Sequence, residues 1–199
     1  MKITAAVAMA VAAGCLGQAA ASEADRTVVV YLANEHAAME NVLFAKDRAA
    51  KMFARIGVQI EWHSLGHGPL PPNALVVEMV EQASENECVG ALACAKPYEG
   101  VRIRVFCDRF RTMVPESMTR YLLAHVLVHE ITHILQGVNR HSESGIMKAR
   151  WDADDFVQMK RKTLPFSSQD VLLIERGLAA RQSRLAIAAS RPESSVGTL

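Results

Sequence analysis

The sequence predicts a mixed α+β domain, with a β-sheet in the N-terminal half of the chain and helices in the C-terminal half. Three observations lead to this prediction. Short β-rich or alternating runs are confined to the part before residue 107. Apolar residues at helical spacing dominate the part after residue 116. The composition, 50% hydrophobic and 22% charged over 199 residues, is typical of one globular domain with a leader or a tail.

Residues 1–21 have the form of a secretory signal peptide. Lys2 supplies a positive charge, residues 3–13 are apolar, and residues 19–21 form an A-x-A cleavage pattern. The apolar run is too short to span a bilayer. A cut before Cys15 would instead leave a lipid anchor, and an N-terminal core helix is a further alternative. The leader therefore predicts an exported protein, periplasmic or secreted, in a compartment where disulfides form.

The N-terminal half of the mature chain predicts a sheet with a backing helix. A β-branched run at 27–32 predicts a buried strand. Helical spacing over 36–56 predicts a helix that ends at Gly57. Further runs predict strands at 58–62, 74–80 and 101–106. Residues 82–100 are polar and are expected to form a long surface loop.

Three cysteines follow the leader, at positions 88, 94 and 107. Cys88 and Cys94 flank a short Gly/Ala-rich turn and could close it, whereas Cys107, in a strand-like run, could pair with Cys94 instead. Either pairing leaves one thiol over. None of the cysteines has the spacing of a metal site, so we expect them to be structural.

The C-terminal half predicts helices over 117–136, 152–162 and 169–189. Gly137 stops the first helix, and Ser167 or Ser168 caps the last one. The folded domain is therefore expected to span residues 22–189, and the small polar residues 190–199 a flexible tail.

The charges are nearly balanced, with 22 basic and 21 acidic residues and a net charge of +1. A general nucleic-acid binder carries a large basic excess. We therefore expect no nucleic-acid partner. The short apolar run of the leader predicts no membrane span, and we expect a monomer.

The first of the three helices carries an HExxH motif, formed by His129, Glu130 and His133. Helix positions i and i+4 lie on one face about 6 Å apart, so both imidazoles can bind one zinc ion. Glu130 would lie beside the metal, where it can take a proton from zinc-bound water and pass it to a leaving amine. The motif predicts hydrolysis of an amide bond, with Glu130 as the general base.

A catalytic zinc needs a third protein ligand and an open position for water. The next ligand-type residue after the helix is His141, and the alternatives are Glu143 or an acid within Asp152–Asp155. His125 shares the ligand face but lies about 12 Å along the helix from His133. We expect His125 to support the ligands or the core rather than to bind the metal.

Read as a whole, residues 129–147, HEITHILQGVNRHSESGIM, resemble the metzincin class of zinc endopeptidases and its matrixin-like branch. Those enzymes have HExxHxxGxxH and then a tight turn with a methionine beneath the zinc. The loop is two residues longer here, since Gly137 and His141 follow His133 by four and eight residues. The resemblance implies a zincin-like fold with three zinc ligands, a general base and a Met-turn residue, which are His129, His133, His141, Glu130 and Met147.

The sequence therefore predicts an exported zinc endopeptidase that acts on peptide or protein substrates. In metzincin-like enzymes an extended substrate adds to an edge strand, for which residues 101–106 are the candidate here. Lys148, Arg150 or Trp151 could face the cleft. The alternatives are a zincin-fold protein that binds zinc without catalysis and a chance motif in an unrelated helical protein. The intact Glu130 disfavours the first alternative, since a structural site needs no base.

Overall fold

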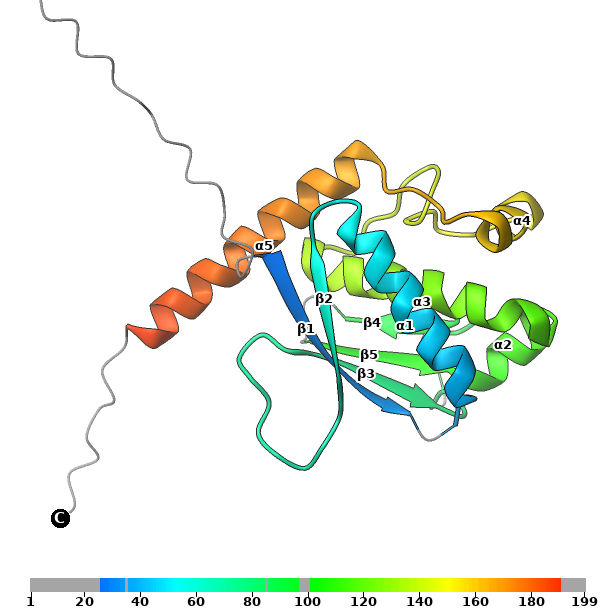
Figure 1. Ribbon diagram of the computed structural model, residues 1–199, viewed down its shortest axis with the longest axis horizontal. Coiled ribbons are helices and arrows are strands. Elements are labelled where there is room, and N and C mark those ends of the chain that lie inside the picture. The colour runs from blue at the N-terminus through cyan, green and yellow to red at the C-terminus, as the bar shows by residue number, and fades with distance from the viewer. Residues whose placement is uncertain (1–25, 35, 85, 97–100, 191–199) are drawn as a thin grey trace, which may run out of the picture.

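The computed structural model describes residues 26–34, 36–84, 86–96 and 101–190. A sheet with helices packed on it forms the body of the protein (Figure 1), which confirms the predicted α+β class. The elements are β1 (Thr27–Asn34), α1 (Met39–Ala54), β2 (Gln59–Ser64), β3 (Leu75–Val80), β4 (Ala93–Ala95), β5 (Arg102–Phe106), α2 (Cys107–Met113), α3 (Glu116–Gln136), α4 (Ala153–Arg161) and α5 (Ser168–Ala189).

Two of the predicted terminal segments lie outside the described residues. They are the signal peptide over 1–21, together with its alternative cut before Cys15, and the tail beyond Ser190. Within the described part of the chain, no helix is both long and apolar enough to cross a membrane.

The five strands form one mixed sheet in the order β2-β1-β3-β5-β4. The first four in this order run parallel, and β4 alone is antiparallel to its neighbour β5. Parallel neighbours need a crossover connection, and α1 supplies it between β1 and β2. The short antiparallel strand β4 is therefore left as one edge of the sheet.

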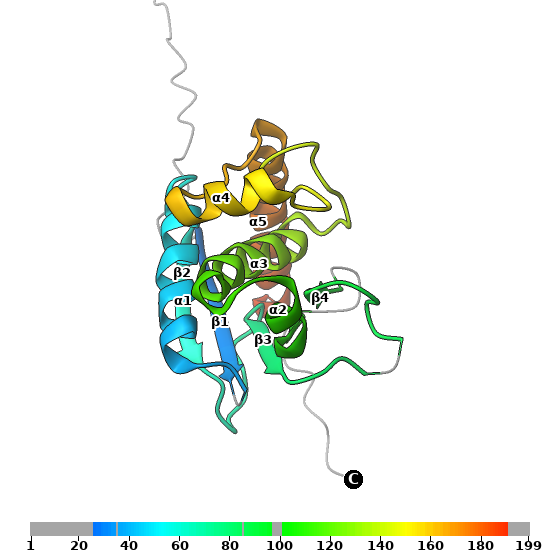
Figure 2. The ribbon, with the colours of Figure 1, turned by 90° about the vertical axis from the view of Figure 1, so that its right-hand side faces the viewer.

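One face of the sheet carries the core. Val28, Val30 and Leu32 of β1 are buried, and the register pairs Val30 with Leu75 and Leu32 with Val77. These side chains pack with apolar residues of α1 and α3 in a single core cluster. The two helices therefore lie side by side over the same face (Figure 2).

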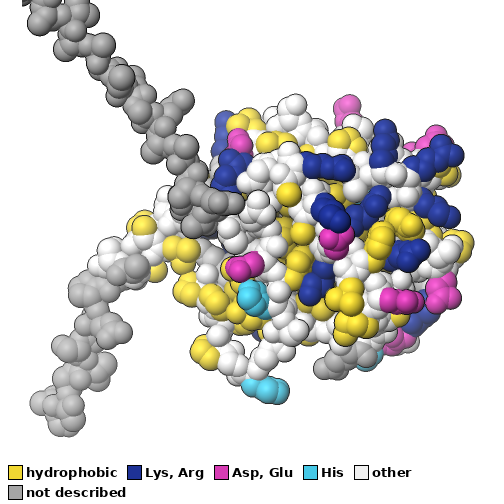
Figure 3. All heavy atoms as spheres, viewed as in Figure 1, with side chains coloured by type: hydrophobic (Ala, Val, Ile, Leu, Met, Phe, Trp, Pro, Cys, Tyr) yellow, Lys and Arg dark blue, Asp and Glu magenta, His cyan; other side chains and the backbone are white. Residues whose placement is uncertain are grey.

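Two arginines form hydrogen bonds between α1 and the end of α4. Arg48 of α1 donates a hydrogen bond to the carbonyl of Met159 at 2.8 Å, and Arg55 donates to the hydroxyl of Thr163. In Figure 3, lysine and arginine side chains gather over this part of the surface. The near-zero net charge of the chain is thus unevenly distributed.

The ends of α3 and α5 agree with the predicted stop and cap signals. Gly137 ends α3 with a φ of 67°, and its N–H donates to the carbonyl of His133 at 3.0 Å. A positive φ of this kind favours glycine. Ser167, rather than Ser168, caps α5, and Asp170 completes a capping box with it.

The sequence does not predict β4 or α2. The residues of β4 are Ala-Cys-Ala, which have no strand pattern of their own, so the pairing with β5 defines the strand. Helix α2 has no side-chain cap at Phe106 to signal its start. Cys107 accordingly begins a helix and does not lie in a strand-like run.

The predicted substrate edge is wrong. Residues 101–106 coincide with β5, which lies between β3 and β4 inside the sheet. The edge is β4, within the segment that the sequence predicts to be a surface loop. Sequence patterns identify strands but not their order, because the order is set by packing between distant segments.

A disulfide joins Cys88 to Cys94, and Cys107 is a free buried thiol. This is the first of the two predicted pairings. Burial, together with the nearby Glu81, raises the pKa of the Cys107 thiol to about 11, so the thiol stays protonated near neutral pH. Arg109 of α2 donates to the carbonyl of Cys88 at 2.7 Å and so ties the disulfide-closed segment to the core.

Candidate metal centre

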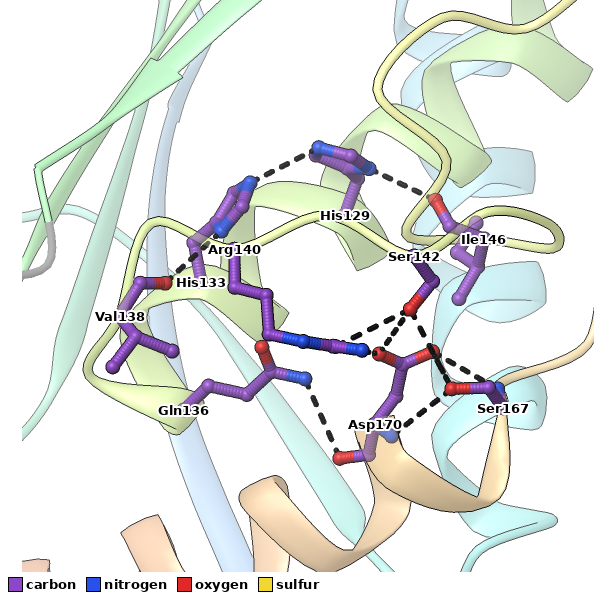
Figure 4. Close-up of polar contacts among 9 residues, drawn as sticks. All are labelled: His129, His133, Gln136, Val138, Arg140, Ser142, Ile146, Ser167 and Asp170. Atoms are coloured by element: carbon purple, nitrogen blue, oxygen red, sulfur yellow. Dashed lines mark hydrogen bonds and ion pairs between the residues drawn. The ribbon is translucent and has the colours of Figure 1, made fainter.

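Helix α3 places one ring nitrogen of each of two histidines close to the other. The Nε2 atoms of His129 and His133 lie 3.1 Å apart, and both side chains are buried. Nδ1 of His129 lies 2.8 Å from the carbonyl of Ile146, and Nδ1 of His133 lies 3.3 Å from the carbonyl of Val138 (Figure 4). A carbonyl oxygen only accepts hydrogen bonds, so each Nδ1 carries the proton.

This hydrogen bonding leaves two lone pairs directed at each other. Burial lowers the pKa of His129 to about 3 and that of His133 to about 4, so neither ring holds a second proton near neutrality. Two ring nitrogens that lie 3.1 Å apart with their lone pairs directed at each other repel each other unless a cation lies between them. Two nitrogens bound to one tetrahedral zinc ion lie about 3.4 Å apart, which is close to the observed separation. The donor set therefore fits a metal ion.

His141 approaches from the loop that follows α3. Its ring centroid lies 5.3 Å from that of His129 and 5.0 Å from that of His133. One possible ligand nitrogen from each of the three residues lies within 4.8 Å of the other two. Three neutral imidazoles with an open fourth position are the donor set of catalytic zinc sites.

The acidic alternatives for the third ligand lie differently. Asp155 contacts Lys148 at 2.7 Å, and Asp152 pairs with the same ammonium group. Glu143 is exposed and does not belong to the histidine group. The structure thus brings His141, and not these carboxylates, to the other two histidines.

Met147 lies in a tight turn directly after this loop and is fully buried. The carbonyl of Met147 accepts from the N–H of Ser142 at 2.7 Å, which closes the turn. Gly145, with a φ of 78°, passes so near to Pro165 that a Cβ atom would lie 2.3 Å from its carbonyl oxygen. The turn therefore brings the carbonyl of Ile146 to His129, which orients that ring.

Glu130 lies beside His129 on α3, facing the edge strand. Its side chain is half-buried, and the backbone N–H of Ala95 in β4 hydrogen-bonds to its carboxylate. Burial raises the pKa of Glu130 to about 7, although the Ala95 hydrogen bond opposes the shift. A carboxyl group with this proton affinity can both accept and return a proton near neutral pH.

His125 has a different role from that of His129 and His133. Its Nδ1 donates to the carbonyl of Tyr121 at 2.7 Å, and its Nε2 accepts from the N–H of Leu164 at 3.2 Å. Because both nitrogens are engaged, neither is free for a metal. The residue anchors the segment that leads into α5.

The residues after the Met147 turn separate into three kinds. The ring of Trp151 lies 5.5 Å from that of His129, so this side chain borders the histidine group. Lys148 is paired with the two aspartates named above, and Arg150 is exposed. Among the three candidates, Trp151 is therefore the one that the structure places at the site.

One residue beside the site was missed by sequence reasoning. Asp170 of α5 is fully buried and hydrogen-bonds to Ser142, next to His141 (Figure 4). The Ser167-x-x-Asp170 pattern of a capping box is readable in the sequence. Its contact with a loop almost thirty residues away is not.

The fold of the chain is shared with solved structures of other proteins. No protein-family model and no curated protein sequence matches the chain. The chain is similar to archaemetzincin from Methanopyrus kandleri, with a TM-score of 0.54 and 13% identity over 77% of this chain and 95% of that one. It is also similar to a zinc-dependent peptidase from Methanocorpusculum labreanum, with a TM-score of 0.50 and 12% identity over 74% and 99%. At these identities the likeness establishes the fold, which is the predicted zincin-like α+β fold.

Proposed function

We propose that the protein is an exported zinc-dependent endopeptidase. The observation that carries the proposal is the convergence of three histidine nitrogens at a helix that also carries the half-buried Glu130, next to His129 in the chain. Support also comes from the shared fold, since one of the similar structures is named as a zinc-dependent peptidase. A purely structural zinc site would need neither the fourth open position nor a carboxylate beside it.

His129, His133 and His141 would hold the zinc ion. Zinc, when bound, polarises a substrate carbonyl and acidifies water. Glu130 would take a proton from the water whose oxygen bonds to the substrate carbonyl carbon, and it would deliver that proton to the nitrogen that leaves when the C–N bond breaks. The N–H of Ala95 holds the Glu130 carboxylate near β4, so the proton is moved close to the edge of the sheet.

The edge strand β4 is the natural place for an extended substrate. One of its sides is paired with β5, and on the other side an edge strand offers backbone groups to an added strand, one of which, the N–H of Ala95, already bonds to Glu130. A peptide that added to this edge would lie along α3 beside Glu130. This arrangement favours cleavage within a chain, because an added strand continues on both sides of the cut bond.

The metzincin subtype, with a matrixin-like Met-turn, is part of the proposal. It is supported by the buried Met147 in the tight turn after His141. Export is supported by the signal-peptide pattern over 1–21 and by the Cys88–Cys94 disulfide, which persists in oxidising compartments.

The test is cleavage of a diverse peptide library by the purified protein, read by mass spectrometry together with zinc content. We expect internal cleavage that a chelator abolishes. Glu130→Gln should lower cleavage at least about 100-fold, the scale of general-base catalysis, while zinc content stays unchanged. Glu116→Gln, at the exposed start of the same helix, is the matched control and should cleave normally.

Two results would count against the proposal. A wild-type protein that binds zinc and cuts no peptide would point to a zinc-binding protein without catalysis. Cleavage that survives Glu130→Gln would remove this residue from the reaction.

A further inference from the structure

A single buried carboxylate of α5 contacts the loop that carries His141. Oδ1 of Asp170 accepts from the hydroxyl of Ser142 at 2.7 Å and from the guanidinium of Arg140 at 3.0 Å. Oδ2 accepts from the hydroxyl of Ser167 at 2.7 Å and from its N–H at 2.9 Å. One oxygen therefore caps the helix, and the other holds the loop (Figure 4).

The loop contacts are placed on both sides of His141. Arg140 precedes it and Ser142 follows it in the chain. In addition, the backbone carbonyl of Asp170 accepts from the side-chain amide of Gln136, the last residue of α3, at 3.4 Å. One residue of α5 thus contacts the loop at its start and at its end.

His141 lacks the support that the other two histidines have. A backbone carbonyl lies at Nδ1 of His129 and of His133 and fixes the orientation of each ring. Among the residues that the structure describes, none forms a hydrogen bond with the ring of His141, which is exposed. Apart from its contacts with the rings of His129 and His133, the position of this ring therefore depends on the backbone on either side of it.

Asp170 is suited to fix that backbone because it stays ionised. Burial on its own would raise the pKa of the carboxyl, but the hydrogen bonds from Ser167, Ser142 and Arg140 bring the pKa below its usual value. Hydrogen bonds to an ionised carboxylate are the strong and directional kind.

We propose that Asp170 is the positioning residue for the third metal ligand and holds His141 at the site by fixing Arg140 and Ser142. The inference rests on the proposed function only in that His141 is taken as a zinc ligand, and it does not require peptidase activity. Groups that orient metal ligands without touching the metal typically change the affinity about 10–100-fold when removed.

The experiment is a double-mutant cycle on zinc affinity, measured by competition with a chelator. Asp170→Asn should weaken zinc binding about 10–100-fold in the wild-type background. In the His141→Ala background the same substitution should have less than about a two-fold effect, because the ligand that it positions is gone. The visible absorption of the Co²⁺-loaded Asp170→Asn protein should shift toward that of His141→Ala.

Two further variants separate positioning from simple helix capping. Ser167→Ala removes the α5 cap and a long 3.5 Å contact with the Ser142 hydroxyl, but it leaves both contacts of Oδ1. It should therefore lower stability and leave zinc affinity within about two-fold. Ser142→Ala removes the hydroxyl that donates to Asp170, together with its contacts to Arg140 at 3.3 Å and Ser167 at 3.5 Å, and leaves the Arg140–Asp170 ion pair. It should weaken zinc binding about 10-fold, at the low end of such effects. If Asp170→Asn does not fold, the cycle of Ser142→Ala with His141→Ala carries the test.

The inference is overturned if the Asp170 or Ser142 substitution weakens zinc binding equally with and without His141. It is also overturned if Ser167→Ala weakens zinc binding as much as Asp170→Asn does. A wild-type protein that binds no zinc would overturn both this inference and the proposed function. Absence of cleavage, with the expected pattern of zinc affinities, would overturn the peptidase alone.

Discussion

Three histidines at four-residue spacing on α3 differ in what their nitrogens contact. In His129 and His133, Nδ1 is satisfied by a carbonyl and Nε2 is left with a lone pair. In His125, both nitrogens bind backbone groups. The hydrogen-bond partner of one nitrogen decides whether the other is available for a metal, so equal spacing in the sequence leads to two different roles.

His125 should make the protein sensitive to acid. The pKa of its ring is lowered to about 4 by burial, with a smaller contribution from the charge of Arg48, against 6.5 for an ordinary histidine. Between these values the unfolded chain binds the proton and the folded one does not, so the free energy of unfolding falls as the pH falls from 6.5 to 4. The full effect is about 3 kcal/mol.

His125→Gln should remove this part of the pH dependence. Urea unfolding at pH values from 4 to 7 should show a shallower slope for the variant than for the wild type, together with a loss of about 1–3 kcal/mol at pH 7 from the disturbed hydrogen bonds. Zinc content should not change. Equal slopes for the two proteins would show that His125 titrates normally in the folded state.

At the scale of elements, the crossing of α3 and α5 depends on Gly177. A Cβ atom at this position would lie 1.6 Å from the carbonyl oxygen of Leu135 in α3. Alanine is the better helix former by about 1 kcal/mol. The low helix propensity of Gly177 is therefore outweighed here by the space that the close approach requires. The close approach brings α5, and with it Asp170, against the end of α3.

Gly177→Ala should therefore destabilise the protein by about 1–3 kcal/mol, the range for overpacking, in denaturant unfolding. It should also weaken zinc binding, because α5 must move away from the loop that Asp170 holds. Gly66→Ala is the control, since a Cβ there has no neighbour within 4 Å. A variant as stable as the wild type would mean that the helices cross more loosely than described.

Helices and strands with a strong hydrophobic pattern in their own sequence were predictable. Elements that exist only because they pair with a distant segment were not. The long helix α3 and its stop at Gly137 follow from spacing and from one glycine. The edge strand β4 has three small residues and exists through its pairing with β5. For this reason the sequence leads to the wrong substrate edge, although it identifies β5 correctly as a strand.

At the scale of the whole molecule, the candidate site is assembled from segments far apart in the chain. Helix α3 provides His129, Glu130 and His133, the following loop provides His141, and β4 and α5 support them from either side. The first three residues were predictable because their geometry is local to one helix. His141 was predictable as the next ligand-type residue after the helix.

The support of the site was not predictable in the same way. The contact of Asp170 with Ser142 and that of Ala95 with Glu130 join segments about thirty residues apart. Contacts of this kind depend on the order of the strands and on the crossing of the helices. A single sequence contains these residues, but it does not show that they come into contact in the folded chain.

The central claim is that three histidines form one zinc site. It is tested most directly by the zinc content of the purified protein after dialysis against a weak chelator. We expect one zinc ion per chain in the wild type and in Glu130→Gln, and well below half of that in His129→Ala, His133→Ala and His141→Ala. Full zinc content in His141→Ala, or no zinc in the wild type, would contradict the account.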